Sequence, residues 1–315
     1  MKSNEKKKII SIICPVYNEK DCIPIFYKRL TDVINPLKDK YEIQILFLNN
    51  SSTDNTLEII LALREKDQSV EVLTYSRNFG YQASVLTGIK KARGEAIVVI
   101  DVDCEDPPEM IPQFIEKWQA GYDIVYGIRN KRDEWQGLIW TRKMFYRLLK
   151  SLADTDIILD MAEFSLFTTK IRDIIVNNRN TFPFIRADIG YAGFKRYGIE
   201  YDRQHRVSGK TKYNLWGMVL FGAGGILSVS TAPMRLAVYF FPLVVLINLI
   251  LLVLDSLLIT NGLYFRLLVT FNLLYIISLI SVFGLYIARI YKNGIGRPVT
   301  IIDWNRSHFN GDKKE

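Results

Sequence analysis

The chain has 315 residues, is 49% hydrophobic and 23% charged, and carries a formal net charge of +8 at pH 7. This length allows one large domain or two smaller ones. The positive charge suits a protein that works against anionic lipid and phosphorylated substrates, and because no nucleic-acid-binding motif accompanies it, nucleic acid is not expected as a partner.

The N-terminus combines a basic run, Lys6-Lys7-Lys8, with a short apolar run, Ile9–Cys14. The pair resembles a signal peptide only superficially, because the apolar run is too short, Pro15 ends it and no cleavage site follows. We therefore expect residues 9–14 to form the first strand of a cytoplasmic domain. The three cysteines of the chain lack metal-type spacing, which agrees with a reducing compartment.

Short apolar runs alternate with amphipathic segments up to about residue 210. The runs predict strands, and the segments between them predict helices, over residues 9–14, 43–48, 57–64, 70–75, 82–92 and 96–100. Strands separated by helices indicate βαβ units and a largely parallel sheet. Each predicted strand ends in a polar loop, and ligands bind beyond the carboxyl ends of such strands. The sequence therefore predicts a binding site at this edge.

Four carboxylates follow the last of these strands: Asp101, Asp103, Glu105 and Asp106. If the strand continues, its period of two puts Asp101, Asp103 and Glu105 on one side. Adjacent carboxylates repel one another unless a cation or protons separate them, so a hard divalent ion is the natural occupant. The alternative is an acidic loop that caps the helix starting near Pro107–Pro108, and the local pattern favours neither.

No Gly-rich phosphate loop of either familiar type is present. A nucleotide would therefore be held by side chains, exposed loop amides and a metal.

Basic residues gather in two places that suit substrate phosphates. One group lies in a loop and the other just before the apolar C-terminal part: Arg129, Lys131 and Arg132, then Arg203, His205, Arg206, Lys210 and Lys212. The alternatives are solvated loops or a patch that binds anionic headgroups. The following segment, Tyr213–Val229, is interpreted as an interfacial helix or as a plain connector.

Two apolar stretches, Leu236–Thr260 and Leu267–Ile290, are each long enough to cross a hydrocarbon core of roughly 30 Å. A buried soluble hairpin is the alternative. Basic residues at both ends of the pair, Arg235 before it and Arg289, Lys292 and Arg297 after it, predict that both chain ends are cytoplasmic.

Several of these segments together resemble glycosyltransferase family 2, and within it the polyprenyl-phosphate glycosyltransferases, the group that includes bactoprenol glucosyltransferase and dolichyl-phosphate mannose synthase. The likeness covers nearly the whole chain, and the segments that carry it occur in the order 15–19, 50–54, 77–80, 101–109, 145–149, 208–213, the two apolar stretches and 296–298.

The resemblance implies a GT-A fold, an α/β architecture with a Rossmann-like, mostly parallel sheet, followed by two C-terminal transmembrane helices. The implied parts are a cytoplasmic catalytic domain (1–212), an interfacial segment (213–232), a transmembrane hairpin (233–291) and a cytoplasmic tail (292–315). It also implies a multi-pass protein of the cell membrane and allows a homo-oligomer, a tetramer in some relatives.

The resemblance also implies roles for particular residues. The metal, Mg²⁺ or Mn²⁺, would be held by Asp101, Asp103 and Glu105. The nucleotide-sugar would be bound by Pro15, Tyr17, Glu19, Asn50, Asp54, Asn78, Asp101, Arg129, Arg132 and Lys212. The residues expected to act in catalysis are Asp103, Glu163 and Arg206.

The chain departs from the family pattern at several of these places. Asn50 stands where relatives usually carry Asp, and Glu105 where they usually carry Gln. Relatives typically have Gly-Asp-Phe-Arg-Leu where this chain has Ala162-Glu163-Phe164-Ser165-Leu166, so Glu163 is longer and Ser165 lacks a guanidinium. Arg129, Lys131, Arg132 and Arg142 are candidate replacements for the lost charge.

The expected activity is the inverting transfer of one sugar from a nucleotide-sugar, a UDP-hexose such as UDP-glucose, to undecaprenyl phosphate or a similar polyprenyl phosphate at the cytoplasmic face. The product would be a lipid-linked sugar donor for modification of cell-surface glycans. The alternatives are a degenerate nucleotide-sugar-binding scaffold, or a glycosyltransferase with another lipid or glycan acceptor. A polysaccharide synthase is disfavoured, because the Gln-x-x-Arg-Trp motif is missing.

Overall fold

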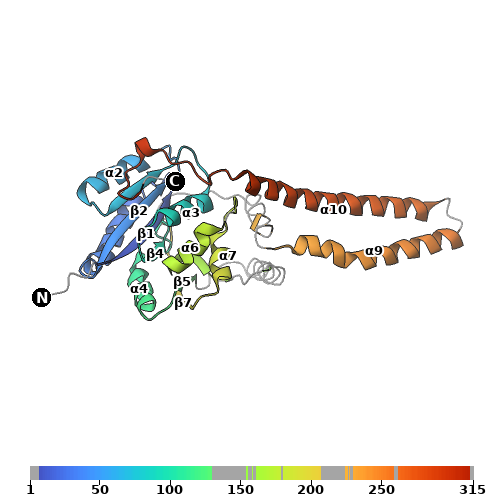
Figure 1. Ribbon diagram of the computed structural model, residues 1–315, viewed down its shortest axis with the longest axis horizontal. Helices are drawn as coiled ribbons and strands as arrows, with labels where there is room; N and C mark the ends of the chain where they lie inside the picture. The colour runs from blue at the N-terminus through green and yellow to red at the C-terminus, as the bar shows by residue number, and fades with distance from the viewer. Residues whose placement is uncertain are drawn as a thin grey trace.

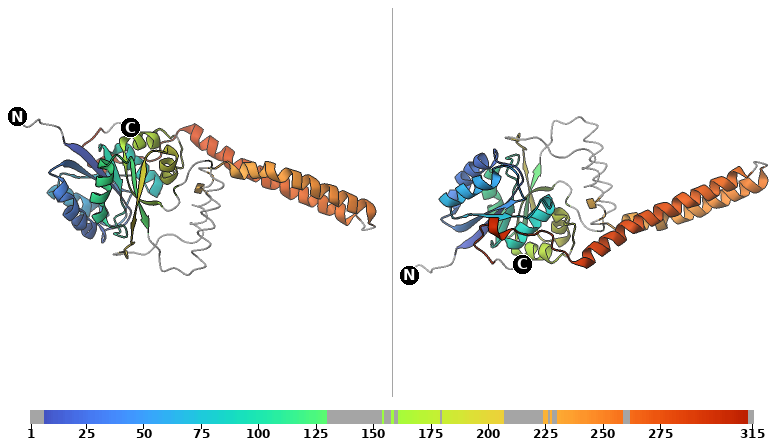
Figure 2. Two further views of the ribbon diagram at one scale, coloured as in Figure 1. Left: turned by 90° about the horizontal axis from the view of Figure 1, so that it is seen from below. Right: turned by 90° about the horizontal axis from the view of Figure 1, so that it is seen from above.

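The computed structural model describes residues 7–129, 154, 158, 161–178, 180–206, 224–225, 227, 230–258 and 262–312. An α/β domain carries two long helices that project from it side by side (Figures 1 and 2). The predicted fold class, a mostly parallel Rossmann-like sheet followed by two long apolar helices, is confirmed.

The centre of the domain is a seven-stranded sheet with the order β3-β2-β1-β4-β6-β5-β7. The first four strands in that order are parallel to one another, β6 runs antiparallel to both of its neighbours, and β5 pairs in parallel with β7. The strands are β1 (Lys8–Val16), β2 (Tyr41–Asn49), β3 (Val70–Thr74), β4 (Ala96–Val99), β5 (Ile124–Arg129), β6 (Met161–Thr168) and β7 (Arg196–Tyr201).

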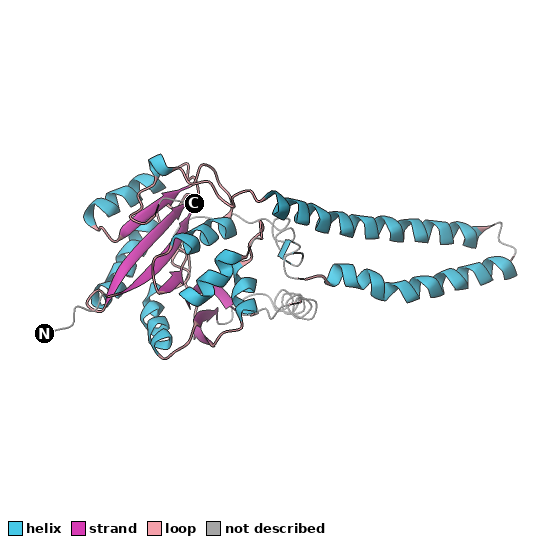
Figure 3. Cartoon of the chain, viewed as in Figure 1, coloured by secondary structure: helices cyan, strands magenta, loops and turns pink. Residues whose placement is uncertain are grey.

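Helices cover both faces of this sheet (Figure 3). On one face α1 (Ile23–Ile34), α2 (Thr56–Lys66) and α4 (Ile111–Gln119) pack on alternate residues of the strands. The other face is covered by α3 (Tyr81–Lys91), α6 (Thr169–Asn177) and α7 (Ile185–Ala192). Because both faces are buried, the central strands are almost wholly apolar, which is why their positions were predictable. Short 3-10 turns occur at Asn35–Leu37, Pro108–Met110 and Trp304–Arg306.

The helices α9 (Ala232–Leu257) and α10 (Leu263–Ile295) contain the two predicted apolar stretches. Both are long and apolar enough to cross a membrane, and almost none of either is buried against protein. This exposure argues against the alternative of a buried soluble hairpin. At 1.5 Å per residue, α10 is about 50 Å long, so it extends well beyond a hydrocarbon core of about 30 Å.

The segment after α10 returns to the α/β domain and adds to the edge of the sheet, which the sequence did not predict. Antiparallel bridges join Val72 to His308 and Tyr75 to Ile302. Ile302 and Phe309 are buried there in the same apolar cluster as α3. The C-terminal residues thus belong to the core that positions the site.

Candidate active site

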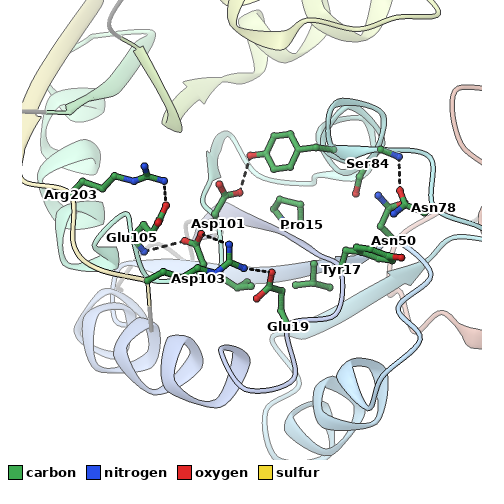
Figure 4. Close-up of a pocket in the computed structure, with 15 residues that line it drawn as sticks. Pro15, Tyr17, Glu19, Asn50, Asn78, Ser84, Asp101, Asp103, Glu105 and Arg203 are labelled. Carbon is green, nitrogen blue, oxygen red and sulfur yellow. Dashed lines mark hydrogen bonds and ion pairs between the residues drawn. The ribbon is translucent and has the colours of Figure 1, made fainter. Parts of the chain in front are cut away.

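A cavity of about 540 Å³ opens at the carboxyl ends of β1 to β4, as predicted (Figure 4). It brings together most of the predicted site residues, namely Pro15, Tyr17, Glu19, Asn50, Asn78, Asp101, Asp103, Glu105 and Arg206. Sequence reasoning missed Tyr81 and Ser84, which also line it. Their signal was available: the first turn of a helix that follows a strand's carboxyl end lies beside the ligand site.

The acidic segment reaches the cavity through a turn and not through a longer strand. Strand β4 ends at Val99, and Cys104 has a positive φ of 61° that turns the chain. Asp103 Oδ1 accepts a hydrogen bond from Glu105 N at 3.1 Å within this turn. The predicted extension of the strand is therefore wrong, although its consequence holds because Asp101, Asp103 and Glu105 all line the cavity.

Two arginines in the loop after β7 form ion pairs with carboxylates of this segment. Arg203 forms an ion pair with Glu105. Arg206 lies 2.6 Å from Glu19 and 3.6 Å from Asp103. The loop after β7 thus closes the acidic end of the cavity by charge pairing.

Asp101 is different, because no lysine or arginine among the described residues forms an ion pair with it. Its Oδ1 accepts a hydrogen bond from the Tyr81 hydroxyl at 2.9 Å. Burial and the neighbouring carboxylates Asp106 and Asp103 raise the pKa of Asp101 to about 8. Burial also raises the pKa of Asp103, against the opposing effect of Arg206. A buried carboxylate without an ion pair, beside a second one that Arg206 offsets only in part, favours a bound cation.

A three-carboxylate metal shell is not preformed. Within the described part of the chain, no group of three or more His, Cys, Asp or Glu residues is arranged to hold an ion. Glu105 forms an ion pair with Arg203, and its role as a third metal ligand stays a prediction. Asp101 and Asp103 remain, and these hard oxygen donors fit Mg²⁺ or Mn²⁺ if a ligand completes the shell.

Arg129 does not line the cavity. Its guanidinium binds Asp106, with Nη2 at 2.8 Å and Nε at 3.2 Å, and Nε also donates to the Tyr201 hydroxyl. Asp106 is 1% exposed, so Arg129 neutralises a buried carboxylate. Its predicted place among the donor-binding residues stays a prediction, and the contacts with Asp106 and Tyr201 give it a structural role. The other basic residues predicted to bind phosphates, Lys131, Arg132, Arg142, Lys210 and Lys212, lie outside the described residues.

Asp54 also lies off the cavity wall. Through Thr56 it links the loop after β2 to the loop after β1. Its Oδ1 accepts hydrogen bonds from the backbone N–H and the hydroxyl of Thr56. Thr56 Oγ1 in turn accepts from Glu19 N at 2.9 Å. These bonds support the loop that carries Glu19, and direct binding of the donor by Asp54 stays a prediction.

Glu163 lies beside the cavity and not on its wall. Its Oε1 is 2.7 Å from Nε of Arg186 on α7 and 3.2 Å from Nε2 of Gln82 on α3. The guanidinium beside Glu163 is thus that of Arg186, which was not among the candidates named from the sequence. Ser165 is buried, and its hydroxyl donates to the Glu163 carbonyl oxygen. The negative charges of Asp101 and Glu163, together with burial, raise the pKa of Tyr81 well above its usual range.

The opposite end of the cavity is polar but uncharged. Its wall consists of Pro15, Tyr17, Asn50, Asn78 and Ser84, which lie away from the acidic segment (Figure 4). The cavity therefore has one end suited to phosphates with a cation and one end suited to a neutral, hydrogen-bonding group.

Comparison of the sequence with known proteins finds matches to glycosyltransferases over most of the chain. A sequence model of the family described as glycosyl transferase family 2 matches residues 11–181. The chain is 37% identical over 303 residues to the uncharacterized glycosyltransferase YkcC of Bacillus subtilis (strain 168), covering 93% of this chain and 92% of that protein. It is 36% identical over 306 residues to the bactoprenol glucosyl transferase of Shigella phage SfV, covering 93% of this chain and 97% of that protein.

Among solved structures, glucosyl-3-phosphoglycerate synthase from Mycobacterium tuberculosis, in complex with Mn²⁺, uridine diphosphate and phosphoglyceric acid, is 16% identical with a TM-score of 0.49. The match covers 70% of this chain and 76% of that chain.

Proposed function

The chain belongs to glycosyltransferase family 2, and from this premise we propose that it transfers a single sugar from a UDP-hexose, such as UDP-glucose, to undecaprenyl phosphate or a similar polyprenyl phosphate, with inversion at the anomeric carbon. The observation that carries this proposal is the cavity at the strand ends, in which a neutral polar end adjoins two under-neutralised aspartates and two arginines. The name of the phage relative supports the lipid acceptor.

Asp101 and Asp103 would hold Mg²⁺ or Mn²⁺ together with the diphosphate of the donor. When bound, the cation neutralises charge that develops on the departing diphosphate. Asp103 then has its catalytic role as a metal ligand. The nucleoside would occupy the neutral end, between Tyr17 and Asn50.

The arginines of the loop after β7 suit the lipid phosphate. Such a phosphate is already anionic near neutral pH, so its oxygen attacks without a strong general base. What it needs is cationic groups that hold it against the second phosphate. Arg203 Nε is buried and has no hydrogen-bond partner among the described residues, so it is suited to donate to such an oxygen. We assign Arg206 the same task and Glu163 a role in orienting the acceptor.

The helices α9 and α10 would anchor the enzyme in the cell membrane. Basic residues at both ends of the pair support a cytoplasmic location of the catalytic domain and both termini. The domain boundaries at 212, 232 and 291, a homotetrameric assembly and a role in modifying cell-surface glycans remain predictions.

The test uses purified full-length protein, undecaprenyl phosphate, Mn²⁺ and a panel of labelled nucleotide-sugars. We expect a labelled sugar-lipid from a UDP-hexose, its loss on chelation of the metal and its recovery when Mn²⁺ is restored. Asp101→Asn and Asp103→Asn should each lower turnover by about 100-fold or more, because they remove charge that holds the cation.

The matched control is Asp32→Asn, which changes an exposed aspartate of α1 outside the cavity and should retain full turnover. Failure to form a sugar-lipid with every donor would refute the acceptor assignment. Nucleotide-sugar binding without turnover would instead support the binding scaffold, and full turnover of both cavity variants would refute the metal role.

A further inference from the structure

The neutral end of the cavity holds a hydroxyl that no other described group engages. Ser84, in the first turns of α3, is 1% exposed, and its Oγ has no hydrogen-bond partner among the described residues. The hydroxyl points into the cavity beside Pro15 and Asn50 (Figure 4). Because buried polar atoms nearly always have partners, an unpaired one on a cavity wall indicates a group that a ligand satisfies.

Two asparagines on the same wall have their oxygens occupied. Asn50 Oδ1 accepts a hydrogen bond from Phe79 N at 2.9 Å, and Asn78 Oδ1 accepts from Gly80 N at 2.8 Å. A backbone N–H only donates, so these contacts fix which amide atom is the oxygen. The NH₂ group of each side chain is then its hydrogen-bond donor for a ligand, while each oxygen already accepts one hydrogen bond.

The Ser84 hydroxyl adds a hydrogen-bond acceptor that has no other partner among the described residues. A serine Oγ accepts as well as donates, and the formal charges that line the cavity lie toward its other end (Figure 4). Two donors with one acceptor match the edge of a uracil ring, where the N3–H lies between two carbonyl oxygens.

We propose that Ser84 determines the base specificity of the sugar donor: its hydroxyl accepts the hydrogen bond of the uracil N3–H, and the amides of Asn50 and Asn78 donate to the flanking carbonyl oxygens. This inference rests on the proposed function, which supplies the nucleotide-sugar. It assigns the acceptor role to Ser84, whose Oγ has no hydrogen-bond partner among the described residues, in preference to the oxygen of Asn50, which already accepts one hydrogen bond from Phe79 N.

A role of Ser84 in nucleotide binding can be told from a structural role by comparing Tm with nucleotide affinity. Since the hydroxyl makes no hydrogen bond within the described protein, Ser84→Ala removes none, and alanine has the highest helix propensity. The variant should therefore keep or slightly raise its Tm while it loses affinity for the nucleotide.

The experiment measures binding of UDP and N3-methyl-UDP by calorimetry, with Mn²⁺ present, to full-length wild-type and Ser84→Ala protein. We expect the substitution to weaken UDP binding by about 5- to 20-fold and to leave pyrophosphate binding unchanged. Wild-type protein should bind N3-methyl-UDP more weakly than UDP, and Ser84→Ala should reduce this discrimination by a similar factor. The control Thr87→Val, which removes a hydroxyl of α3 bonded to Thr300, should keep full UDP affinity.

Equal UDP affinity in Ser84→Ala and wild type, undiminished discrimination, or an equal loss of pyrophosphate binding would each overturn the inference. Preference of the wild type for GDP or ADP would overturn it and leave glycosyl transfer standing. Absence of any nucleotide binding would remove the proposed function as well.

Discussion

At the residue scale, the protein treats its buried carboxylates in contrasting ways. Asp106 is paired with Arg129 at 2.8 Å, and Glu71, 1% exposed, is paired with Arg93 at 2.6 Å. Among the described residues, Asp101 forms no ion pair and accepts a hydrogen bond from the Tyr81 hydroxyl, and burial with the neighbouring Asp106 and Asp103 raises its pKa to about 8. A carboxylate in a cavity whose charged form is left disfavoured is a candidate for a functional role.

Asp188 on α7 allows the free-energy cost of a buried carboxylate to be measured away from the cavity wall. Burial raises its pKa to about 6, opposed by a hydrogen bond from Asn178 Nδ2 at 2.7 Å. A folded-state pKa above the ordinary 3.8 means that stability is lost as pH rises from about 4 through 6. Asp188→Asn keeps an oxygen acceptor and removes the charge. We expect its stability advantage over wild type to grow across this range and then level off at about 1–3 kcal/mol.

Thermal unfolding of the detergent-solubilised protein at pH 5 and pH 8 tests this. The exposed Asp39→Asn is the matched control. An advantage of Asp188→Asn that is the same at both pH values, or absent, contradicts the assignment.

At the element scale, α9 and α10 are joined by a pair of amides in the middle of otherwise apolar helices. Asn248 and Asn272 donate to each other at 3.1 and 2.5 Å. Each also donates to the carbonyl oxygen four residues before it. Because lipid offers no competing partners, such a reciprocal pair fixes the register of two helices.

Replacement of one asparagine should therefore cost more than half of what replacement of both costs. We expect Asn248→Leu and Asn272→Leu each to destabilise the hairpin by about 1–2 kcal/mol, since each leaves an amide in the lipid without its partner. The double variant should lose less than the sum of the two. Ser278→Ala, which removes only a bond to the serine's own helix, is the control. Strict additivity in detergent unfolding experiments would rule out the pairing.

At the scale of the whole molecule, the chain after α10 joins the two long apolar helices to the part of the α/β domain that lines the cavity. Ile301 O accepts from Ser76 N at 3.0 Å, immediately before the loop that carries Asn78. Ser307 Oγ accepts from Thr74 N at 2.8 Å. The edge of the sheet beside the neutral end of the cavity is thus completed by residues that follow both apolar helices.

Loss of this contact should weaken the α/β domain as a whole. Phe309 is 7% exposed and lies in the cluster under α3. We expect Phe309→Ala to cost about 2–4 kcal/mol and to lower the Tm by several degrees. Ile301→Ala, at a side chain that is 50% exposed, should change stability by less than about 0.5 kcal/mol. Equal Tm values for the two variants would show that the C-terminal segment is not part of the core.

The sequence by itself determined the central strands, the helices between them and the two apolar spans, because burial on both faces and span length impose local patterns. It also determined the edge of the sheet that holds the cavity, since the carboxyl ends of parallel strands meet there. The place of Asp101, Asp103 and Asn50 at that edge followed from their position in the chain.

Only the tertiary structure decided how these side chains are paired. Arg206 forms an ion pair with Glu19, which lies 187 positions before it in the sequence. Arg186 pairs with Glu163, and Arg129 pairs with Asp106 outside the cavity wall. The antiparallel β6 and the return of the C-terminal segment to β3 were equally unpredicted. Local periodicity specifies which face of an element is buried, but a hydrogen bond or ion pair depends on two distant segments arriving at the same point, and that is fixed only when the chain packs.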